Sequence, residues 1–536
     1  MATLRKQIIT ALFKSLLRGK SLLQAILAYW TGSLAVTADG KDRGSVSSHR
    51  SIQEFLEEAE ALFLGPVSQH DLQQLSRQLM KQFIERLQTD MECMLPSYSH
   101  QLPHGSERGH YLALDVGGST LRVALVELRG RISKVGEHSS ILSMRNFPIT
   151  PEIKSLEGMA FFDWMAARIK DTLSGDLVQH HSLDQPLLMA MAWSFPIEQT
   201  SLAGGKLQGM GKGFLAQNGL VGQDLGLIIK TACGKQGLNV ELGGIVNDSS
   251  ACLLSESYSH SSTRFGLILG TGINIAAYLP ISAIGRSKVG QKPADWTHLI
   301  VNSELGMFGH DILPLTRWDR ELLKTHPMPT FQPLEHLTSG MYLGEICRQV
   351  LIEAIESTGA FGGILPSSLK KRYSLATETL SMIQSDTSLE LGDACKEFSL
   401  RHPSSHNPTT SDIFLLRQLA SFISKRSSAL VATCVYTFWK LRIDAQADWV
   451  KTLPNSSPLR PTAEADRDIT ETTVAFNGSV IENYPGYLSS CQQYLDDLVA
   501  GQEGESGTQS TIQLVSAKES SLLGAAVALA SAQGSA

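Results

Sequence analysis

Two segments far apart in this chain repeat one pattern, in which an apolar run, a turn containing glycine and a second apolar run follow one another. The first is LALDVGGSTLRVALVEL at 112–128, and the second is FGLILGTGINIAAYL at 265–279. Short apolar runs joined through glycines are typical of a β-hairpin, because glycine takes turn conformations that other residues avoid. Together with the helical patterns between the strands, these two hairpins indicate an architecture with more than one sheet-centred lobe.

The rest of the chain mixes strand and helix patterns. Further strands are predicted at 187–194 and 243–246, while helical patterns fill 52–93 and dominate 335–441. This mixture indicates an α/β fold, and a length of 536 residues exceeds what one hydrophobic core usually holds. Prolines and glycines predict surface loops at 453–468 and 501–510.

The N-terminal arm, residues 1–38, carries basic side chains and no acidic ones. Apolar residues recur there near helical spacing, which predicts a basic amphipathic helix. Such a helix could bring residues 1–30 to a membrane surface or serve as a mitochondrial address, or it could pack on the protein body or a partner. We expect a cytoplasmic protein, with a mitochondrial or mitochondrial-surface location as the alternative. A linker containing Gly and Ser follows at 40–51.

Charge and cysteine content limit the possible ligands. The formal net charge of −6 argues against a general nucleic-acid binder, which would need a basic excess to neutralise phosphates. The seven cysteines are scattered, with no CxxC pair and no nearby histidines at metal-ligand spacing. They are therefore expected to be reduced thiols of an intracellular protein rather than zinc ligands.

The first hairpin turn offers groups that suit a phosphate. Asp115 closes an apolar strand, and Gly117, Gly118, Ser119 and Thr120 follow it. Exposed backbone N–H groups and hydroxyls in a tight turn can bind phosphate oxygens. The carboxylate could hold Mg²⁺ through water, as is common in phosphate sites. An ordinary hairpin would show the same residues, so this turn alone decides nothing.

Two further segments add to this picture. The turn LGTGIN at 269–274 could hold the same polyphosphate from the other side, and a pair of such turns is more specific than one. In ELGGIVNDSSACLLSE at 241–256, Asn247 and Asp248 follow an apolar run. Asp248 could simply cap the next helix, because Asp is a good N-cap residue. A catalytic role requires more of the sequence.

Several blocks together resemble the eukaryotic-type hexokinase family of the actin-like, two-lobed ATPase superfamily. They are SFPIEQTSL at 194–202, GKGF at 211–214, VNDS at 246–249, LGTGIN at 269–274, NSELGMFG at 302–309 and SGMYLGEI at 339–346. Their order and spacing follow the family from about residue 52 to 533. The resemblance implies an α/β fold with a ligand cleft between a small and a large domain.

The same resemblance implies a division of the chain. The expected parts are an N-terminal arm and linker (1–51), an N-terminal helical part of the large domain (52–110), the small domain (111–248), the rest of the large domain (249–511) and a C-terminal segment that returns to the small domain (512–536). Oligomeric state stays open.

The family's activity is transfer of the γ-phosphate of ATP, with Mg²⁺, to the 6-hydroxyl of a hexose. By the resemblance, Asp248 is the catalytic base that accepts the proton of this hydroxyl, and Lys212 offsets charge that develops during transfer. The positions that match sugar-binding residues are Ser194, Lys212, Asn247, Asp248, Asn274, Glu304 and Glu335. The positions that match nucleotide-binding residues are Asp115, which also serves the metal through water, and Gly117, Gly118, Ser119, Thr120, Gly270, Thr271, Gly272, Gly478, Ser479 and Gly524.

Two departures from the family concern the sugar. Gly211 stands where members typically have Thr, and Leu305 stands where they have Trp. Both changes remove volume or a hydroxyl near the expected sugar site, and an enlarged pocket could admit an N-acetyl group. The pattern is similar to that of fungal hexokinase-like N-acetylglucosamine kinases. We therefore expect an N-acetylhexosamine substrate, N-acetylglucosamine, with glucose or fructose as the alternative.

Two other departures concern the nucleotide. Thr120 stands where the family usually has Asn, and residues 520–523 replace a glycine-rich stretch near adenosine. Lost glycines could narrow that pocket, which makes a non-catalytic sugar sensor or regulator an alternative of another class. The presence of both phosphate turns together with Asp248 favours catalysis, because phosphoryl transfer depends mainly on positioning.

Overall fold

The computed structural model describes residues 50–131, 137–173, 186–211, 213–290, 292–501 and 510–533. The predicted N-terminal arm, nearly all of the linker and most of the 501–510 loop lie outside these ranges. The strands are β1 (Leu95–Pro96), β2 (Gly109–Val116), β3 (Thr120–Leu128), β4 (Ser139–Pro148), β5 (Leu187–Trp193), β6 (Ile197–Gln199), β7 (Gly205–Leu207), β8 (Val240–Val246), β9 (Thr263–Leu269), β10 (Ile273–Pro280), β11 (His298–Asn302), β12 (Glu471–Asn477) and β13 (Thr511–Ser516).

The helices confirm the two helical regions expected at 52–93 and 335–441. They are α3 (Ile52–Leu64), α4 (Gln69–Thr89), α5 (Pro151–Lys154), α6 (Met159–Thr172), α7 (Leu225–Lys235), α8 (Asp248–Ser259), α9 (Arg286–Val289), α10 (Arg317–Lys324), α11 (Pro333–Thr338), α12 (Gly340–Thr358), α13 (Thr377–Ser385), α14 (Gly392–Arg401), α15 (Thr410–Thr452), α16 (Arg460–Arg467), α17 (Ser479–Asn483), α18 (Tyr487–Ala500) and α19 (Ser520–Gln533).

The small lobe is built on one sheet. Among the described residues its strands follow the order β4-β3-β2-β5-β8, and β2, β5 and β8 run parallel. Alternate residues of β2 face opposite sides, so Leu112 and Leu114 join a core with α6 and α7, while Ala113 joins a second core with α8 and α19. Both faces are therefore buried, which explains the near-continuous apolar run of this strand.

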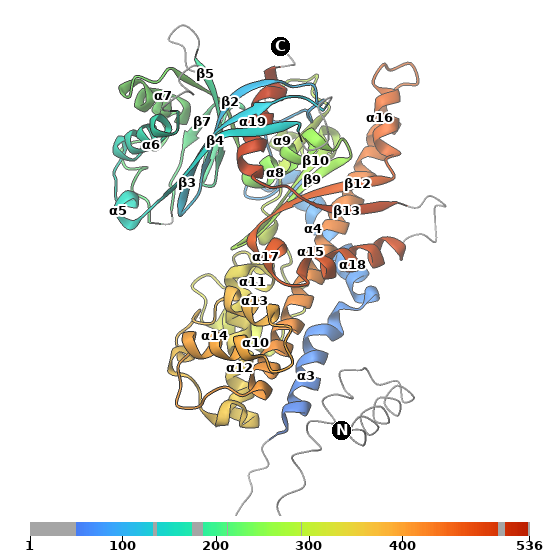
Figure 1. Ribbon diagram of the computed structural model, residues 1–536. Coiled ribbons are helices and arrows are strands. Elements are labelled where there is room, and N and C mark those ends of the chain that lie inside the picture. Colours follow the sequence, from blue (N-terminus) through green and yellow to red (C-terminus); the bar gives the residue numbers. More distant parts are fainter. Residues whose placement is uncertain are drawn as a thin grey trace, which may run out of the picture.

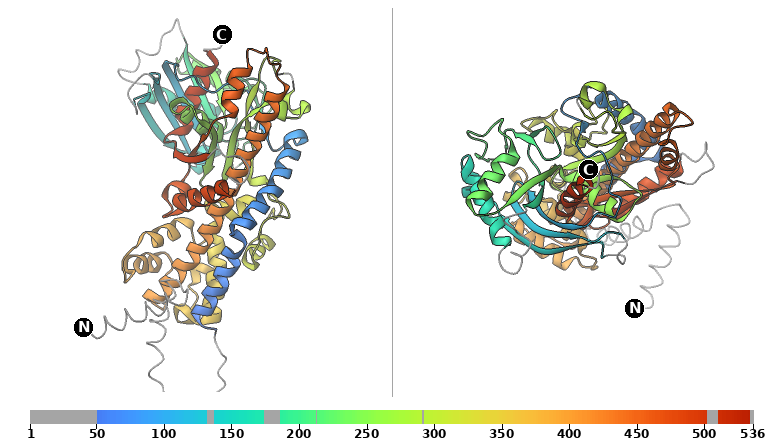
Figure 2. Two further views of the ribbon diagram at one scale, coloured as in Figure 1. Left: turned by 90° about the vertical axis from the view of Figure 1, so that its right-hand side faces the viewer. Right: turned by 90° about the horizontal axis from the view of Figure 1, so that it is seen from above.

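The large lobe is built on a second sheet and a helical base. Its described strands follow the order β1-β11-β10-β9-β12-β13, with β9, β12 and β13 parallel. Helices α10, α11, α12, α13 and α14 form the helical base. The long helix α15 extends from this base to α16, and α3 and α4 lie along α15 in both side views (Figures 1 and 2). The two predicted hairpins, β2–β3 and β9–β10, belong to different sheets, and the expectation of more than one sheet-centred lobe is confirmed.

Two helices lie between the sheets. α8 and α19 pack on one another, and their buried residues share a hydrophobic cluster with residues of β2, β3 and β5 on one side and of β10 and β11 on the other (Figure 1). Gly524 in α19 makes this contact close, because a Cβ there would overlap the carbonyl of Ala251 in α8. Gly266 in β9 does the same on the large-lobe side, where a Cβ would overlap the backbone of Ser249.

Two details differ from the sequence-based expectations. The stretch 453–468 is not all loop, because α16 occupies its second half; Pro461 lies in the first turn of that helix, where its missing N–H costs nothing. Asp466 in α16 is held by Arg264 and Arg442. The segment expected to return to the small domain begins with β13, which pairs with β12 in the large-lobe sheet, so only α19 reaches the small-lobe sheet.

No helix in the described ranges is both long enough and apolar enough to cross a membrane. All seven cysteines fall within the described residues and are free, and all except Cys395 are buried.

Candidate active site

The strands of the small lobe bring three predicted site segments to one edge. Because β2, β5 and β8 are parallel, their carboxyl ends lie at the same edge of the sheet, where open α/β sheets bind ligands. Asp115 and the first turn follow β2, Ser194 follows β5, and Asn247 and Asp248 follow β8. The Ser194 N–H donates to the carbonyl of Val116, which ties the first two segments directly.

Asn247, rather than Asp248, is the N-cap of α8. Its Oδ1 accepts hydrogen bonds from the N–H groups of Ser249, at 2.9 Å, and Ser250, at 3.3 Å. Asp248 is the first helical residue and is only partly buried, and its Oδ1 accepts from the Ser249 N–H at 2.7 Å. The capping role considered for Asp248 is thus wrong. The carboxylate therefore lies at the positive end of the helix dipole.

The first phosphate turn is held by a short backbone contact and flanked by an ion-pair network. The Gly117 N–H donates to the Thr120 carbonyl at 3.1 Å. Asp115 accepts two bonds from Arg122, which lies directly opposite it in the hairpin, at 2.9 and 2.5 Å. Arg122 also donates to Glu519 at 2.7 Å, just before α19. The arginine therefore links the turn to the segment that was expected to border adenosine.

The second turn is enclosed by other backbone. The N–H groups of Gly340 and Met341, at the start of α12, donate to the carbonyls of Gly270 and Thr271 at 2.8 and 3.3 Å. On its other side a Cβ at Gly270 would lie 3.4 Å from the Ser479 nitrogen, and one at Gly478 would overlap the Leu269 carbonyl. Glycine is needed at 478 for this approach and for its φ of +129°.

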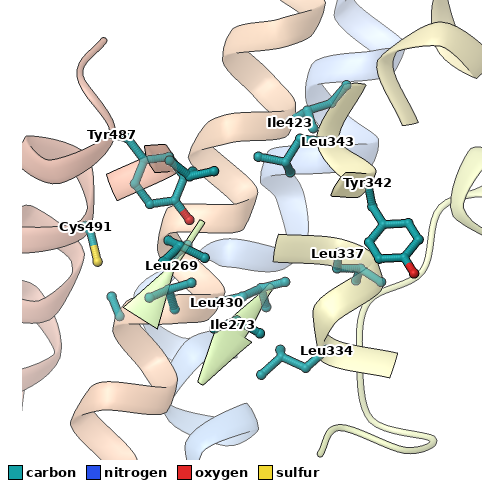
Figure 3. Packing of buried hydrophobic residues seen from close by; sticks show 14 of the residues in the cluster. Leu269, Ile273, Leu334, Leu337, Tyr342, Leu343, Ile423, Leu430, Tyr487 and Cys491 are labelled. Atoms are coloured by element: carbon teal, nitrogen blue, oxygen red, sulfur yellow. The ribbon is translucent and has the colours of Figure 1, made fainter. Parts of the chain in front are cut away.

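The core fixes the two ends of this turn. Leu269 and Ile273 flank the turn and point into the large-lobe core among Leu334, Leu430 and Tyr487 (Figure 3). A turn anchored by two buried side chains has little freedom, so its carbonyl and N–H groups keep fixed directions.

Glu335 connects the second turn to the predicted sugar residues. Its Oε2 accepts from the Ile273 N–H at 3.1 Å, and a Cβ at Gly272 would lie 2.7 Å from the same oxygen. The glycine is thus what lets the carboxylate reach the turn. A Cβ added at Gly270 would adjoin the predicted nucleotide residue Ser479, and one added at Gly272 would adjoin Glu335, so this three-residue turn lies beside both halves of the predicted site.

A hydrogen-bonded chain joins the remaining sugar candidates. Asn274 Nδ2 donates to Asn302 Oδ1 at 2.8 Å, and Asn302 Nδ2 donates to Glu304 Oε1 at 2.7 Å. Glu304 has a left-handed backbone, with φ +53° and ψ +53°, which costs a non-glycine residue about 1 kcal/mol or more. Burial raises the pKa of the Glu304 carboxyl, and the bond from Asn302 opposes that rise. Such strain and pKa perturbation are features of functional sites.

The remaining predicted residues are not seen to line the site, and one of them is not described by the structure. Lys212 lies outside the described residues. Gly211 has φ +64°, and a Cβ there would meet no atom within 4 Å. Leu305 is 0 % exposed and belongs to the large-lobe core, so its side chain is packed rather than lining an enlarged pocket. Gly524 allows the close contact of α19 with α8. Its role in binding the nucleotide stays a prediction.

Sequence reasoning missed Arg122 and Asn302. The hairpin itself contained the signal for Arg122, since pairing two strands around the turn places it opposite Asp115. Asn302 stands two residues before Glu304 in the quoted block NSELGMFG, but only the fold reveals its contact with Asn274.

The residues fit ATP and Mg²⁺ in a limited way. Within the described residues there is no group of three His, Cys, Asp or Glu side chains that could hold a metal directly. Asp115, which lies near the end of β2 beside the first turn, is the carboxylate that would hold Mg²⁺ through water, and nucleotide phosphates would supply other ligands. Arg122 already pairs with Asp115, so a bound metal would compete with or displace that contact.

Comparisons with known proteins identify the family. A hexokinase family model matches residues 264–531, and a second one matches residues 57–258. Hexokinase-1 of Nicotiana tabacum is 30% identical over 76% of this chain and 77% of its own length, and the hexokinase of Kluyveromyces lactis is 28% identical over 84% and 87%. The structure of a Schistosoma mansoni hexokinase complexed with glucose matches with a TM-score of 0.70 and 26% identity, over 90% of this chain and 100% of that one. The chain therefore belongs to the eukaryotic-type hexokinase family of ATP-dependent hexose kinases.

Proposed function

We propose that the protein phosphorylates glucose, or a hexose of the same shape, at the 6-hydroxyl with ATP. The observation that carries the proposal is the turn of Gly270 to Gly272: a Cβ added at Gly270 would lie 3.4 Å from the Ser479 nitrogen, and Glu335 accepts from the N–H of Ile273, the next residue, at 3.1 Å. Such a turn can align a triphosphate with a sugar, and alignment is the main source of rate in phosphoryl transfer.

The choice of glucose replaces the preference expected from the sequence. That preference for N-acetylglucosamine rested on lost volume at Gly211 and Leu305. Leu305 is fully packed in the core, which removes half of the argument, and the matching relatives are named hexokinases, one of them bound to glucose. These facts support the glucose alternative.

The nucleotide side also supports catalysis over a sensor role. The residues that replace glycines before Gly524 are accommodated by packing: Ser520 and Ser521 are buried, and Leu522 is a member of the cluster between the sheets. Leu522 thus packs between α8, α19 and the sheets. The burial of these side chains argues against a narrowed adenosine pocket.

In the proposed reaction, each residue has a simple task. Glu304 and Glu335 accept hydrogen bonds from sugar hydroxyls, and Asp248 accepts the proton of the 6-hydroxyl as its oxygen attacks the γ-phosphate. The two glycine turns hold the triphosphate through backbone N–H groups. Mg²⁺, when bound, would neutralise charge on the phosphates. Movement of the lobes toward each other would exclude water and limit ATP hydrolysis.

An ADP-release assay with glucose, fructose, mannose, glucosamine and N-acetylglucosamine tests the proposal. We expect the highest kcat/KM with glucose or mannose. A higher value for N-acetylglucosamine would contradict the glucose assignment. Folded protein that binds sugar by calorimetry and yet releases no ADP with any of the five would identify a sensor.

A further inference from the structure

The side-chain amide of Asn274 has a fixed orientation, because backbone N–H groups, which can only donate, face one end of it. Its Oδ1 lies 2.8 Å from the Ile275 N–H and 3.3 Å from the Leu305 N–H, and the Ser303 hydroxyl is also within 3.3 Å. Backbone N–H groups only donate, so this atom must be the acceptor oxygen. The other atom of the amide, which faces Asn302, must then be the donor nitrogen.

This polarity passes along the chain of side chains. Asn302 presents its oxygen to Asn274 at 2.8 Å, so the nitrogen of Asn302 is the atom 2.7 Å from Glu304 Oε1. Glu304 Oε1 consequently meets a donor and cannot itself carry a proton toward Asn302. Two backbone N–H groups thus determine, through two amides, how the partly buried carboxylate of Glu304 is oriented.

We propose that Asn302 is a positioning residue of the sugar site, which holds Glu304 as a hydrogen-bond acceptor for a sugar hydroxyl. The inference rests on the proposed function and adds a residue that the family resemblance did not supply. Asn302 ends β11, and Glu304 follows after one residue in its left-handed conformation. The short link and the fixed backbone leave the carboxylate dependent on the amide for its direction.

The surroundings of Glu304 make the amide important. Burial raises the pKa of Glu304, so the acid is easily neutralised, and Asn302 is the neighbour that favours the ionised form. Among the described residues, Cys93 interacts electrostatically with Glu304, and its thiol pKa is raised to about 11 chiefly by burial. Arg86 Nη1 lies 3.7 Å from the Sγ of that thiol and pairs with Asp90. Within the described part of the chain, Asn302 is the one side chain whose hydrogen bond lowers the pKa of Glu304.

Asn302→Asp is the decisive variant, because it exchanges the donor for a second carboxylate at constant size. Two adjacent carboxylates share a proton, so the acid limb of the pH profile of kcat/KM for glucose should move up by about one pH unit or more. Asn302→Ala removes the donor without adding charge. Its glucose affinity, measured by calorimetry, should fall about tenfold or more, while KM for ATP stays within about twofold.

Asn455→Asp is the matched control, since it makes the same chemical change at an exposed site beyond α15. It should leave the pH profile unchanged. An acid limb of Asn302→Asp that coincides with that of the parent would overturn the inference. If Asn302→Asp does not fold, parental glucose affinity in Asn302→Ala would overturn it equally. Absence of glucose turnover in the parent would instead overturn the proposed function, so the two failures are distinguishable.

Discussion

Asn247 caps α8, while its neighbour Asp248 is the proposed catalytic base. The sequence alone left both roles open for Asp248. Asn247 caps α8 through Ser249 and Ser250, so the helix start does not depend on the carboxylate. We therefore expect Asp248→Asn to keep its fold and its sugar affinity while kcat falls by roughly 10²- to 10⁴-fold, the usual contribution of a general base. Steady-state kinetics and calorimetry with glucose would measure the two effects separately.

Two controls accompany this variant. Asp393→Asn changes a side chain that is 89% exposed and should have parental kinetics. Asn247→Ala removes the cap and should lower the free energy of unfolding by about 0.5–2 kcal/mol. A parental kcat in Asp248→Asn would remove the base assignment.

A tryptophan at position 305 tests the enlarged-pocket hypothesis against the observed packing. The hypothesis predicts that the larger side chain fills free space in the sugar pocket, whereas the packing predicts that it destabilises the core. The Leu305 side chain is 0 % exposed in the large-lobe core, so Leu305→Trp should overpack that core and lower the free energy of unfolding by about 1–3 kcal/mol. Thermal denaturation would measure this change. Leu305→Met, which nearly conserves volume, should cost less than about 1.5 kcal/mol. An unchanged melting temperature for Leu305→Trp, with selective loss of N-acetylglucosamine use, would restore the enlarged-pocket hypothesis.

At the scale of elements, the contact between α8 and α19 links α8, which begins with the proposed base Asp248, to both sheets. A Cβ at Gly524 would overlap the backbone carbonyl of Ala251, which cannot rotate aside as a side chain can. Gly524→Ala should therefore lower the free energy of unfolding by about 1–3 kcal/mol, even though alanine favours helix. Chemical denaturation would measure it.

The matched control for this variant is Gly234→Ala in α7, where an added Cβ would meet no atom within 4 Å. There the higher helix propensity of alanine should leave stability unchanged or raised by up to about 1 kcal/mol. Equal stability of the two alanine variants would show that the helices can separate without cost.

The elements that the sequence predicted well are those with strong local signals. Both hairpins were expected because apolar runs flank glycine turns, and α3 begins at Ile52 after the N-cap Ser51, which forms a capping box with Glu54. α16 was missed because prolines near it suggested a loop, although Pro461 fits a first helical turn. The link from Asn274 to Asn302 could not be predicted, since it depends on the pairing of β10 with β11.

At the scale of the whole molecule, Arg131 joins the places where the chain passes between the lobes. Arg131 follows β3 of the small lobe. Its guanidinium donates to the carbonyls of Pro103 and His104, in the segment that leads from β1 into β2, at 3.2 and 3.0 Å. It also donates to Ser257 and Tyr258, at the last turn of α8, at 2.6 and 2.8 Å. A cation at this end of α8 also complements the helix dipole.

Because Asp248 lies at the opposite end of α8, the hold of Arg131 on that helix should influence how the base meets the sugar. Arg131→Ala frees α8 from the small-lobe edge, so we expect kcat to fall and KM for glucose to rise together, each several-fold, as is usual for hinge substitutions. The control is Arg129→Ala, which removes the same charge from a side chain that is 40% exposed and pairs with Glu127. It should behave like the parent. Small-angle scattering with and without glucose would report whether the lobes still close, and parental kinetics in Arg131→Ala would mean that this contact only stabilises the fold.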